Sequence, residues 1–137
     1  MSVTPSPTTV RSAADAISLL SLAVVDPLAA ETLAFLLDDD GIGGVIVVFD
    51  GTTSADSVLD IVEVMVRAGA QAPQSTSLVV ASVRPSSGVL PGDVDRWLEA
   101  SSIASLHGLE LLEWYVISPF GIECPRDLLG EPERWAE

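Results

Sequence analysis

Apolar residues recur with two different spacings along this chain, and each spacing predicts a type of secondary structure. Residues 54–68 carry apolar side chains three and four positions apart, which predicts a helix with one buried face. Gly69 follows as the expected C-terminal cap of that helix. Residues 12–23 predict an earlier helix with Ser12 as its N-cap. A later helix, ending at Gly108, is expected to bury Val94, Trp97, Leu98 and Leu106.

Three short runs rich in β-branched residues predict buried strands. They cover residues 43–49, 78–83 and 109–118, and Asp50-Gly51 supplies a turn after the first of them. Beyond Pro119, several Gly and Pro residues indicate only a short extended piece and a short last helix.

The segment from residue 27 to residue 37 is expected to form another helix. Asp26-Pro27 is typical of a helix start, with Asp as N-cap and Pro as the first helical residue. The acidic run at residues 38–40 would then be a solvated helix end. It lacks the alternating oxygen ligands and the closing glutamate of a calcium-binding loop.

Strands separated by helices predict an α/β fold, with one layered domain whose small mixed β-sheet is flanked by helices. We expect residues 1–10 to be a flexible tail and residues 11–137 to be that domain. No segment suits a membrane span or a secretory signal, so we expect a soluble, cytoplasmic protein that does not bind membranes. The single cysteine, Cys124, excludes an internal disulfide.

Charge is the most unusual property of the composition. Twenty acidic residues against six arginines, with no lysine, give a formal net charge of -14. Nucleic-acid binding depends on cationic side chains that neutralise phosphates, so we expect no nucleic-acid partner. The high apolar content, 48%, has two explanations that remain open: a core rich in small apolar residues, or a subunit interface. On the second explanation we expect a homodimer.

One loop between a predicted strand and a predicted helix has the appearance of a functional loop. It covers residues 82–95, with the sequence S-V-R-P-S-S-G-V-L-P-G-D-V-D. Such junctions often carry the binding and catalytic residues of α/β proteins. A simple turn, with Gly92 as N-cap of the next helix, would explain the same residues. The candidate cleft residues in this loop are Ser82, Arg84, Ser86, Ser87 and Asp95.

This loop and its surroundings resemble the JAB/MPN metallopeptidase-like domain, in its bacterial RadC-like branch. That family has H-x-H-P-S-G at the strand end, followed by S-x-x-D at the helix start. Ser82 and Arg84 stand at the two histidine positions, Pro85 at the proline, Gly92 at the serine and Asp95 at the aspartate. The resemblance covers residues 26–124. It implies a JAB/MPN fold with a layered architecture similar to that of cytidine deaminases.

The resemblance implies the fold but argues against peptidase activity. The family's zinc needs two imidazoles and an aspartate, and only Asp95 remains here. Serine is a poor zinc ligand and arginine is a permanent cation. We therefore expect no metal, no cofactor and no catalytic residues, and we expect Arg84 to form an ion pair with Asp95. His107, the only histidine, is expected to cap a helix.

These observations favour a non-catalytic RadC-like protein that serves as a protein-interaction or assembly module, with a protein partner that the sequence does not identify. The alternative is a protein that uses the former metal cleft differently, as a small-molecule or anion-binding protein or a divergent hydrolase.

Overall fold

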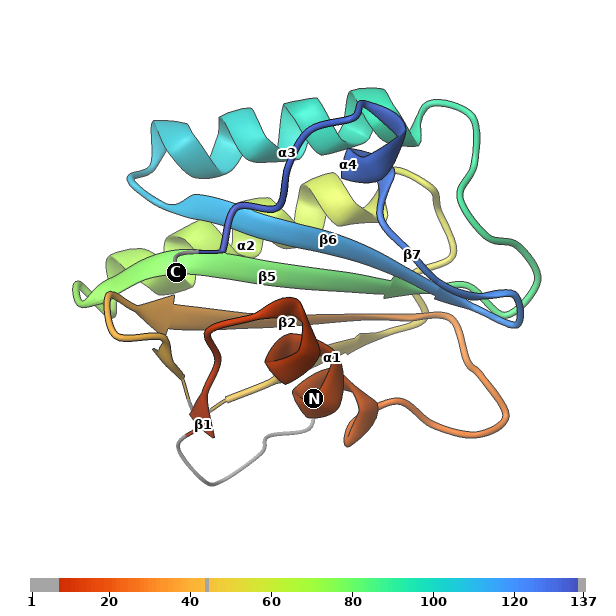
Figure 1. Cartoon of the computed structure of the whole chain (residues 1–137), viewed down its shortest axis with the longest axis horizontal. Coiled ribbons are helices and arrows are strands. Elements are labelled where there is room, and N and C mark those ends of the chain that lie inside the picture. The colour runs from red at the N-terminus through yellow and green to blue at the C-terminus, as the bar shows by residue number, and fades with distance from the viewer. Residues whose placement is uncertain (1–7, 44, 136–137) are drawn as a thin grey trace.

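A five-stranded mixed β-sheet organises the fold (Figure 1). The computed structural model describes residues 8–43 and 45–135. The strand order is β4-β2-β5-β6-β7, and β1 and β3 form a separate two-stranded ribbon. The strands are β1 (Thr8–Thr9), β2 (Glu31–Asp38), β3 (Ile42–Gly43), β4 (Val47–Asp50), β5 (Ser75–Val83), β6 (Glu110–Ser118) and β7 (Gly121–Glu123). The helices are α1 (Ala13–Ser21), α2 (Ser57–Ala70), α3 (Asp93–Leu106) and α4 (Pro125–Leu128).

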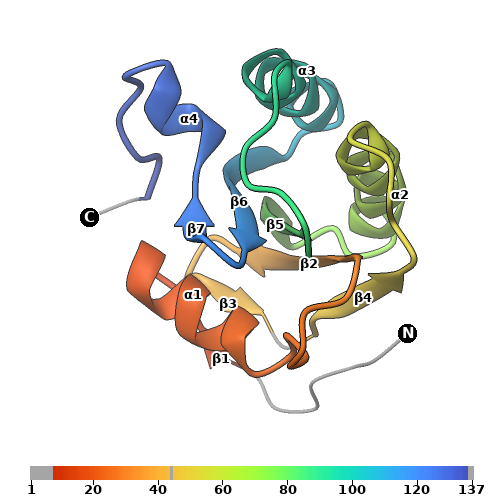
Figure 2. The same ribbon diagram turned by 90° about the vertical axis from the view of Figure 1, so that its right-hand side faces the viewer.

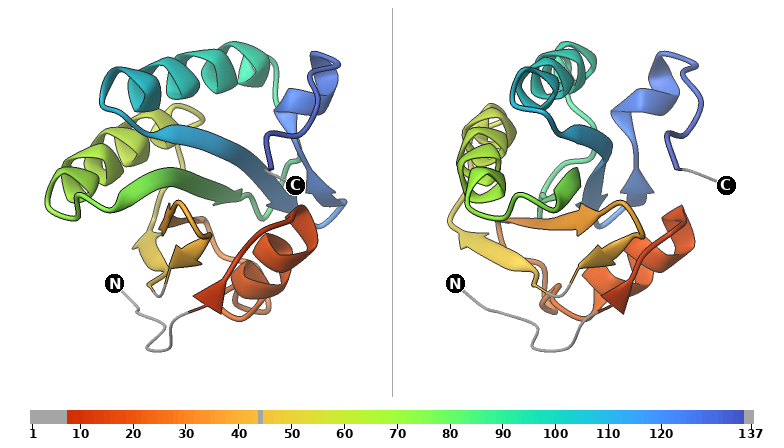
Figure 3. Two further views of the ribbon diagram at one scale, coloured as in Figure 1. Left: turned by 60° about the vertical axis from the view of Figure 1, so that its left-hand side comes forward. Right: turned by 90° about the vertical axis from the view of Figure 1, so that its left-hand side faces the viewer.

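Strand directions place two connecting loops at one edge of the sheet. β5 and β6 are parallel, whereas β2 is antiparallel to both β4 and β5. The carboxyl ends of β4, β5 and β6 therefore meet at the same edge. Helices α2 and α3 begin just after β4 and β5 and cover one face of the sheet, and α1 lies on the other face with the β1–β3 ribbon (Figures 2 and 3). This arrangement confirms the expected α/β class, with a mixed sheet flanked by helices.

The strongest sequence patterns are confirmed. The apolar positions expected to face inward from α2 are all buried: Val58, Ile61, Val62, Met65 and Val66. The predicted strands at residues 78–83 and 109–118 correspond to β5 and β6. Ser12 is the N-cap of α1, and its hydroxyl oxygen accepts a hydrogen bond from the backbone N–H of Asp15.

The helix expected at residues 27–37 is wrong, because most of this segment is strand β2. Leu33, Phe35 and Leu37 pack on the α1 face of the sheet, while Ala34 and Leu36 pack on the opposite face. A strand covered on both faces has an almost continuous apolar run, which hides its alternation. The acidic run after it is consequently the end of a strand and a turn, and not the end of a helix.

Smaller expectations also need correction. Gly69 lies inside α2, where it packs against Leu109, and the C-cap is Gln71. Leu98 and Leu106 are exposed on α3, and small residues, Ala100 and Ala104, take the buried positions beside Trp97. The predicted strand at residues 43–49 is shifted, since β4 begins at Val47.

Part of the expected flexible tail belongs to the fold. Thr8 and Thr9 pair with β3, and Val10 is buried in the core. Gly41 permits this close approach, because a Cβ atom there would lie 2.5 Å from the carbonyl oxygen of Val10. Residues 1–7 of the expected tail lie outside the described residues.

The segment after β7 covers an open edge of β6. β7 pairs only with residues 116–118, so among the described residues no strand lies on that side of the first half of β6. Arg126 of α4 donates from Nε to Oε2 of Glu113 at 2.7 Å, and Arg134 donates to the carbonyl oxygen of Leu111 at 3.0 Å. Arg134 thus satisfies a backbone carbonyl that a longer strand would otherwise have paired, and Arg126 satisfies the buried carboxylate of Glu113.

In the part of the chain that the structure describes, no helix is long and apolar enough to cross a bilayer.

Candidate functional site

The residues singled out from the loop line a pocket at the carboxyl ends of β4 and β5. Ser82, Arg84, Ser86 and Ser87 all contribute to this cavity of about 280 Å³, which we call the loop pocket. Asp95 does not line it. The other walls come from the start of β2 and from the segment that leads into α2. Eight of the lining side chains carry hydroxyl groups: Thr32, Thr52, Thr53, Ser54, Ser57, Ser82, Ser86 and Ser87.

Arg84 forms an ion pair in this region, but its partner is Asp93 and not Asp95. Its guanidinium donates from both terminal nitrogens to the two carboxylate oxygens of Asp93, at 2.6 and 3.1 Å. Asp95 is exposed. Gly92 is the N-cap of α3, so Asp93 is the first helical residue and Asp95 the third, about 200° further around the axis. The predicted contact between Arg84 and Asp95 is therefore wrong.

Asp93 is the centre of a chain of charged groups. Its side chain is fully buried and also accepts hydrogen bonds from the backbone N–H of Leu90, at 2.7 Å, and from Arg96, at 2.9 Å. Arg96 also donates a hydrogen bond from Nε to the carboxylate of Asp56, the N-cap of α2, at 2.8 Å. Burial by itself would raise the pKa of Asp93, but the hydrogen bonds from Arg84, Leu90 and Arg96 prevail and lower it. The loop is thereby fixed to the starts of both α2 and α3.

The loop does not offer a set of metal ligands. Arg84 occupies the second histidine position with a cation that is already paired, and the hydroxyl of Ser82 accepts a hydrogen bond from Nε1 of Trp114 at 2.9 Å. Within residues 8–43 and 45–135, no three His, Cys, Asp or Glu side chains come together as a possible metal site. The side chains present therefore do not fit the zinc of the family that the sequence resembles.

His107 and Cys124 are not placed for nucleophilic catalysis. His107 is the C-cap of α3, and its Nδ1 lies 2.8 Å from the carbonyl oxygen of Ile103. Cys124 follows β7, which pairs with the opposite end of β6. Burial, reinforced by the charge of Glu113, raises the pKa of the Cys124 thiol to about 12, so the reactive thiolate is disfavoured.

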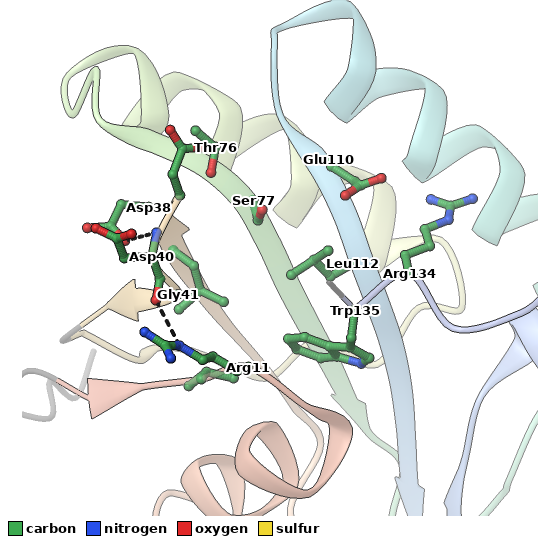
Figure 4. Close-up of a pocket in the computed structure, with 13 residues that line it drawn as sticks. Arg11, Asp38, Asp40, Gly41, Thr76, Ser77, Glu110, Leu112, Arg134 and Trp135 are labelled. Carbon is green, nitrogen blue, oxygen red and sulfur yellow. Dashed lines mark hydrogen bonds between the residues drawn. The ribbon is translucent and has the colours of Figure 1, made fainter. Parts of the chain in front are cut away.

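A second, larger pocket lies at the opposite end of the sheet. It has a volume of about 500 Å³ and is formed by the end of β2, the following turn, the first residues of β5 and β6, and the C-terminal segment. Figure 4 shows the ring of Trp135 beside Leu112 on one side and the aspartates on the other. We call this cavity the acidic pocket, because four carboxylates line it: Asp38, Asp39, Asp40 and Glu110.

The two arginines beside the acidic pocket bind other groups. Arg11 donates to the backbone carbonyl oxygen of Asp40 at 3.3 Å. Arg134 forms an ion pair with Glu131 at 2.6 Å and lies over the ring of Trp97, with 4.4 Å from its guanidinium carbon to the ring centroid. Neither arginine forms an ion pair with a carboxylate of the pocket, and the four carboxylates outnumber the two arginines that line it.

No protein-family model matches the chain, and a search of curated proteins finds no related sequence.

Sequence reasoning found four of the residues in the loop pocket and missed the rest. Asp93 had a signal, because the helix dipole favours an acidic residue in the first turn of a helix. The acidic run at residues 38–40 was visible as well, but its assignment to a helix end hid its position beside Glu110 and Trp135.

Proposed function

We propose that this chain is a non-catalytic relative of the RadC-like JAB/MPN domains and acts as a protein-interaction or assembly module. The order strand, loop, helix, strand at residues 75–118 supports this proposal, because it follows the order that the resemblance implies. The pair formed by Arg84 and Asp93 also supports it. A paired guanidinium at a histidine position provides neither a metal ligand nor a general base.

The observation that carries the interaction role is the distribution of charge. In the part of the chain that the structure describes, four of the six arginines bind carboxylates: Arg84, Arg96, Arg126 and Arg134. The remaining carboxylates of a chain with net charge -14 are left largely uncompensated. Such a surface is complementary to a basic protein and repels acidic partners.

We place the contact at the acidic pocket. A lysine or arginine side chain from a partner would enter a pocket lined by the carboxylates of Asp39, Asp40 and Glu110 and by the ring of Trp135. Cations bind favourably over tryptophan rings, and the combination of carboxylates with an aromatic face selects a cation over a neutral group. The partner is therefore a basic protein segment.

The pocket variant Asp39→Asn/Asp40→Asn is expected to weaken binding of a fluorescent Lys- and Arg-rich peptide by roughly tenfold, measured by anisotropy at low salt. The control Asp60→Asn/Glu63→Gln makes the same charge change on the exposed side of α2 and should weaken binding less than about threefold. A protein retained from native lysate should follow the same order. Equal losses in the two variants would show that only the overall charge matters and would refute the pocket.

We also propose that the module is a homodimer whose interface includes the edge strand β7. Exposed apolar side chains gather in this part of the chain: Phe120, Ile122, Leu128 and Leu129. Light scattering at micromolar concentration should give twice the 14.3 kDa chain mass, and Phe120→Ser/Leu128→Ser should give a monomer. A monomer mass for the unmodified protein would contradict the dimer.

A further inference from the structure

Three hydroxyl groups converge on the inner wall of the loop pocket. Thr32 of β2 and Ser82 of β5 are directly opposite each other in the sheet, and their side chains lie on the face covered by α2 and α3. Thr52 follows β4 and lies 2.8 Å from Thr32, oxygen to oxygen. Thr32 is 1% exposed and Ser82 is 8% exposed. Buried hydroxyls of this kind normally have partners for their protons.

Within the described residues, two of these hydroxyl protons have no acceptor. Nε1 of Trp114 donates to Ser82, so the Ser82 oxygen acts as an acceptor there and its own proton must point elsewhere. Thr32 and Thr52 share one hydrogen bond, which uses one of their two protons and leaves the other. The same oxygens keep lone pairs that can still accept. The wall therefore offers both donors and acceptors to the cavity.

Charged ligands are disfavoured in this pocket. The positive charge of Arg84 is neutralised by Asp93. The amides at the start of α2 are used within the chain: the N–H of Asp56 donates to the Ser54 hydroxyl, and the N–H of Ser57 donates to the Ser54 carbonyl oxygen. An anion would find no unpaired cation among the lining residues, in a protein of net charge -14.

We propose that the loop pocket binds a small neutral polyol, of the class of a monosaccharide or cyclitol. Hydroxyl groups donate and accept at the same time, so they match a wall with two free protons and free lone pairs, whereas a carbonyl only accepts. The cavity volume of about 280 Å³ is at the lower limit for ligand pockets and suits a single ring. Ala30, Pro85 and Leu90 supply apolar walls for the C–H surfaces of such a ring. This site is separate from the acidic pocket and independent of the assembly role.

The indole N–H of Trp114 reports directly on the site. In ¹H–¹⁵N spectra the three tryptophans give three indole signals, which Trp→Phe variants assign. Titration with glucose and with myo-inositol, to about 100 mM, is expected to shift the Trp114 signal with saturation in the millimolar range. The signals of Trp97 and Trp135 should stay in place. Inorganic phosphate and N,N-dimethylacetamide serve as the anion and the carbonyl probes.

Two variants test the hydroxyl groups. Thr52→Val keeps the shape of the side chain and removes its hydroxyl, and Ser82→Ala removes the acceptor of Trp114 as well. Each is expected to weaken polyol binding by roughly tenfold. Ser77→Ala, at the other end of β5, should leave it unchanged. Thr52→Val keeps the test valid if Ser82→Ala does not fold. No saturable Trp114 shift with either polyol, a shift with phosphate alone, or unchanged affinity in Thr52→Val would overturn the proposal.

Discussion

Replacing Asp93 by alanine should destabilise the fold by about 3–5 kcal/mol, whereas the same change at Asp95 should cost less than about 0.5 kcal/mol. The two aspartates lie two residues apart in the first turn of α3, so helix propensity and charge change equally in both variants. Only Asp93 is buried, and only its loss leaves Arg84, whose side chain is 12% exposed, without a carboxylate. Urea denaturation of the two variants measures the difference.

A double-mutant cycle then measures the interaction between Arg84 and Asp93 separately from their contacts with other groups. Arg84→Met combined with Asp93→Ala is expected to lose less stability than the sum of the two single changes, because neither charge remains unpaired in the double variant. Equal costs at Asp93 and Asp95, or strict additivity in the cycle, would show that the ion pair does not hold the loop.

The ion pair between Arg84 and Asp93 also predicts how the stability of the fold changes in acid. The folded-state pKa of Asp93 lies below the ordinary carboxyl value, so its contribution is fully present above about pH 4 and is lost as pH falls through the folded-state pKa. The stability gap between the unmodified protein and Asp93→Asn should therefore close below about pH 4. A gap that stays constant from pH 6 to pH 2 would contradict the lowered pKa.

Arg126→Met is expected to cost about 3–5 kcal/mol as well, because it leaves the carboxylate of Glu113, which is fully buried, without its cation. The matched control is Arg67→Met, which removes an exposed arginine from α2 and should cost less than about 0.5 kcal/mol. Glu113→Gln added to Arg126→Met should recover part of the loss, since no buried charge then remains. Urea midpoints of the four proteins provide the comparison.

The stability of Arg126→Met should change with pH in the opposite direction to the stability that Asp93 contributes. Burial raises the pKa of Glu113 even with Arg126 present, and without Arg126 the pKa must rise further. A carboxyl with a raised folded-state pKa loses stability as pH rises through that value. The variant should thus be most stable in mild acid. A cost that does not change between pH 5 and pH 8 would mean that Glu113 finds another partner.

The local sequence was sufficient to predict elements that bury one face or that begin with their own capping residue. The helix around Ile61 and Val62 repeats its apolar residues every three to four positions, and packing did not alter it. Ser12 could be predicted as the N-cap of α1, because the hydroxyl of an N-cap bonds only to the backbone of its own helical turn. For residues 33–37 the same kind of pattern predicted a helix, whereas the structure has strand β2. Both sides of β2 are covered, so the alternation that identifies a strand is absent from the sequence.

By itself, the sequence determined the α/β class, the charge and the position of the loop after β5, because all of these depend on composition or on neighbours along the chain. Tertiary structure alone decided which aspartate meets Arg84. The helix starts at Asp93, and a shift of two residues turns a side chain to the other side of the axis. Tertiary structure also determined which residues line the two pockets. Each brings together residues from several distant segments, such as Asp40, Glu110 and Trp135, whose proximity depends on strand order and on where the C-terminal segment folds back.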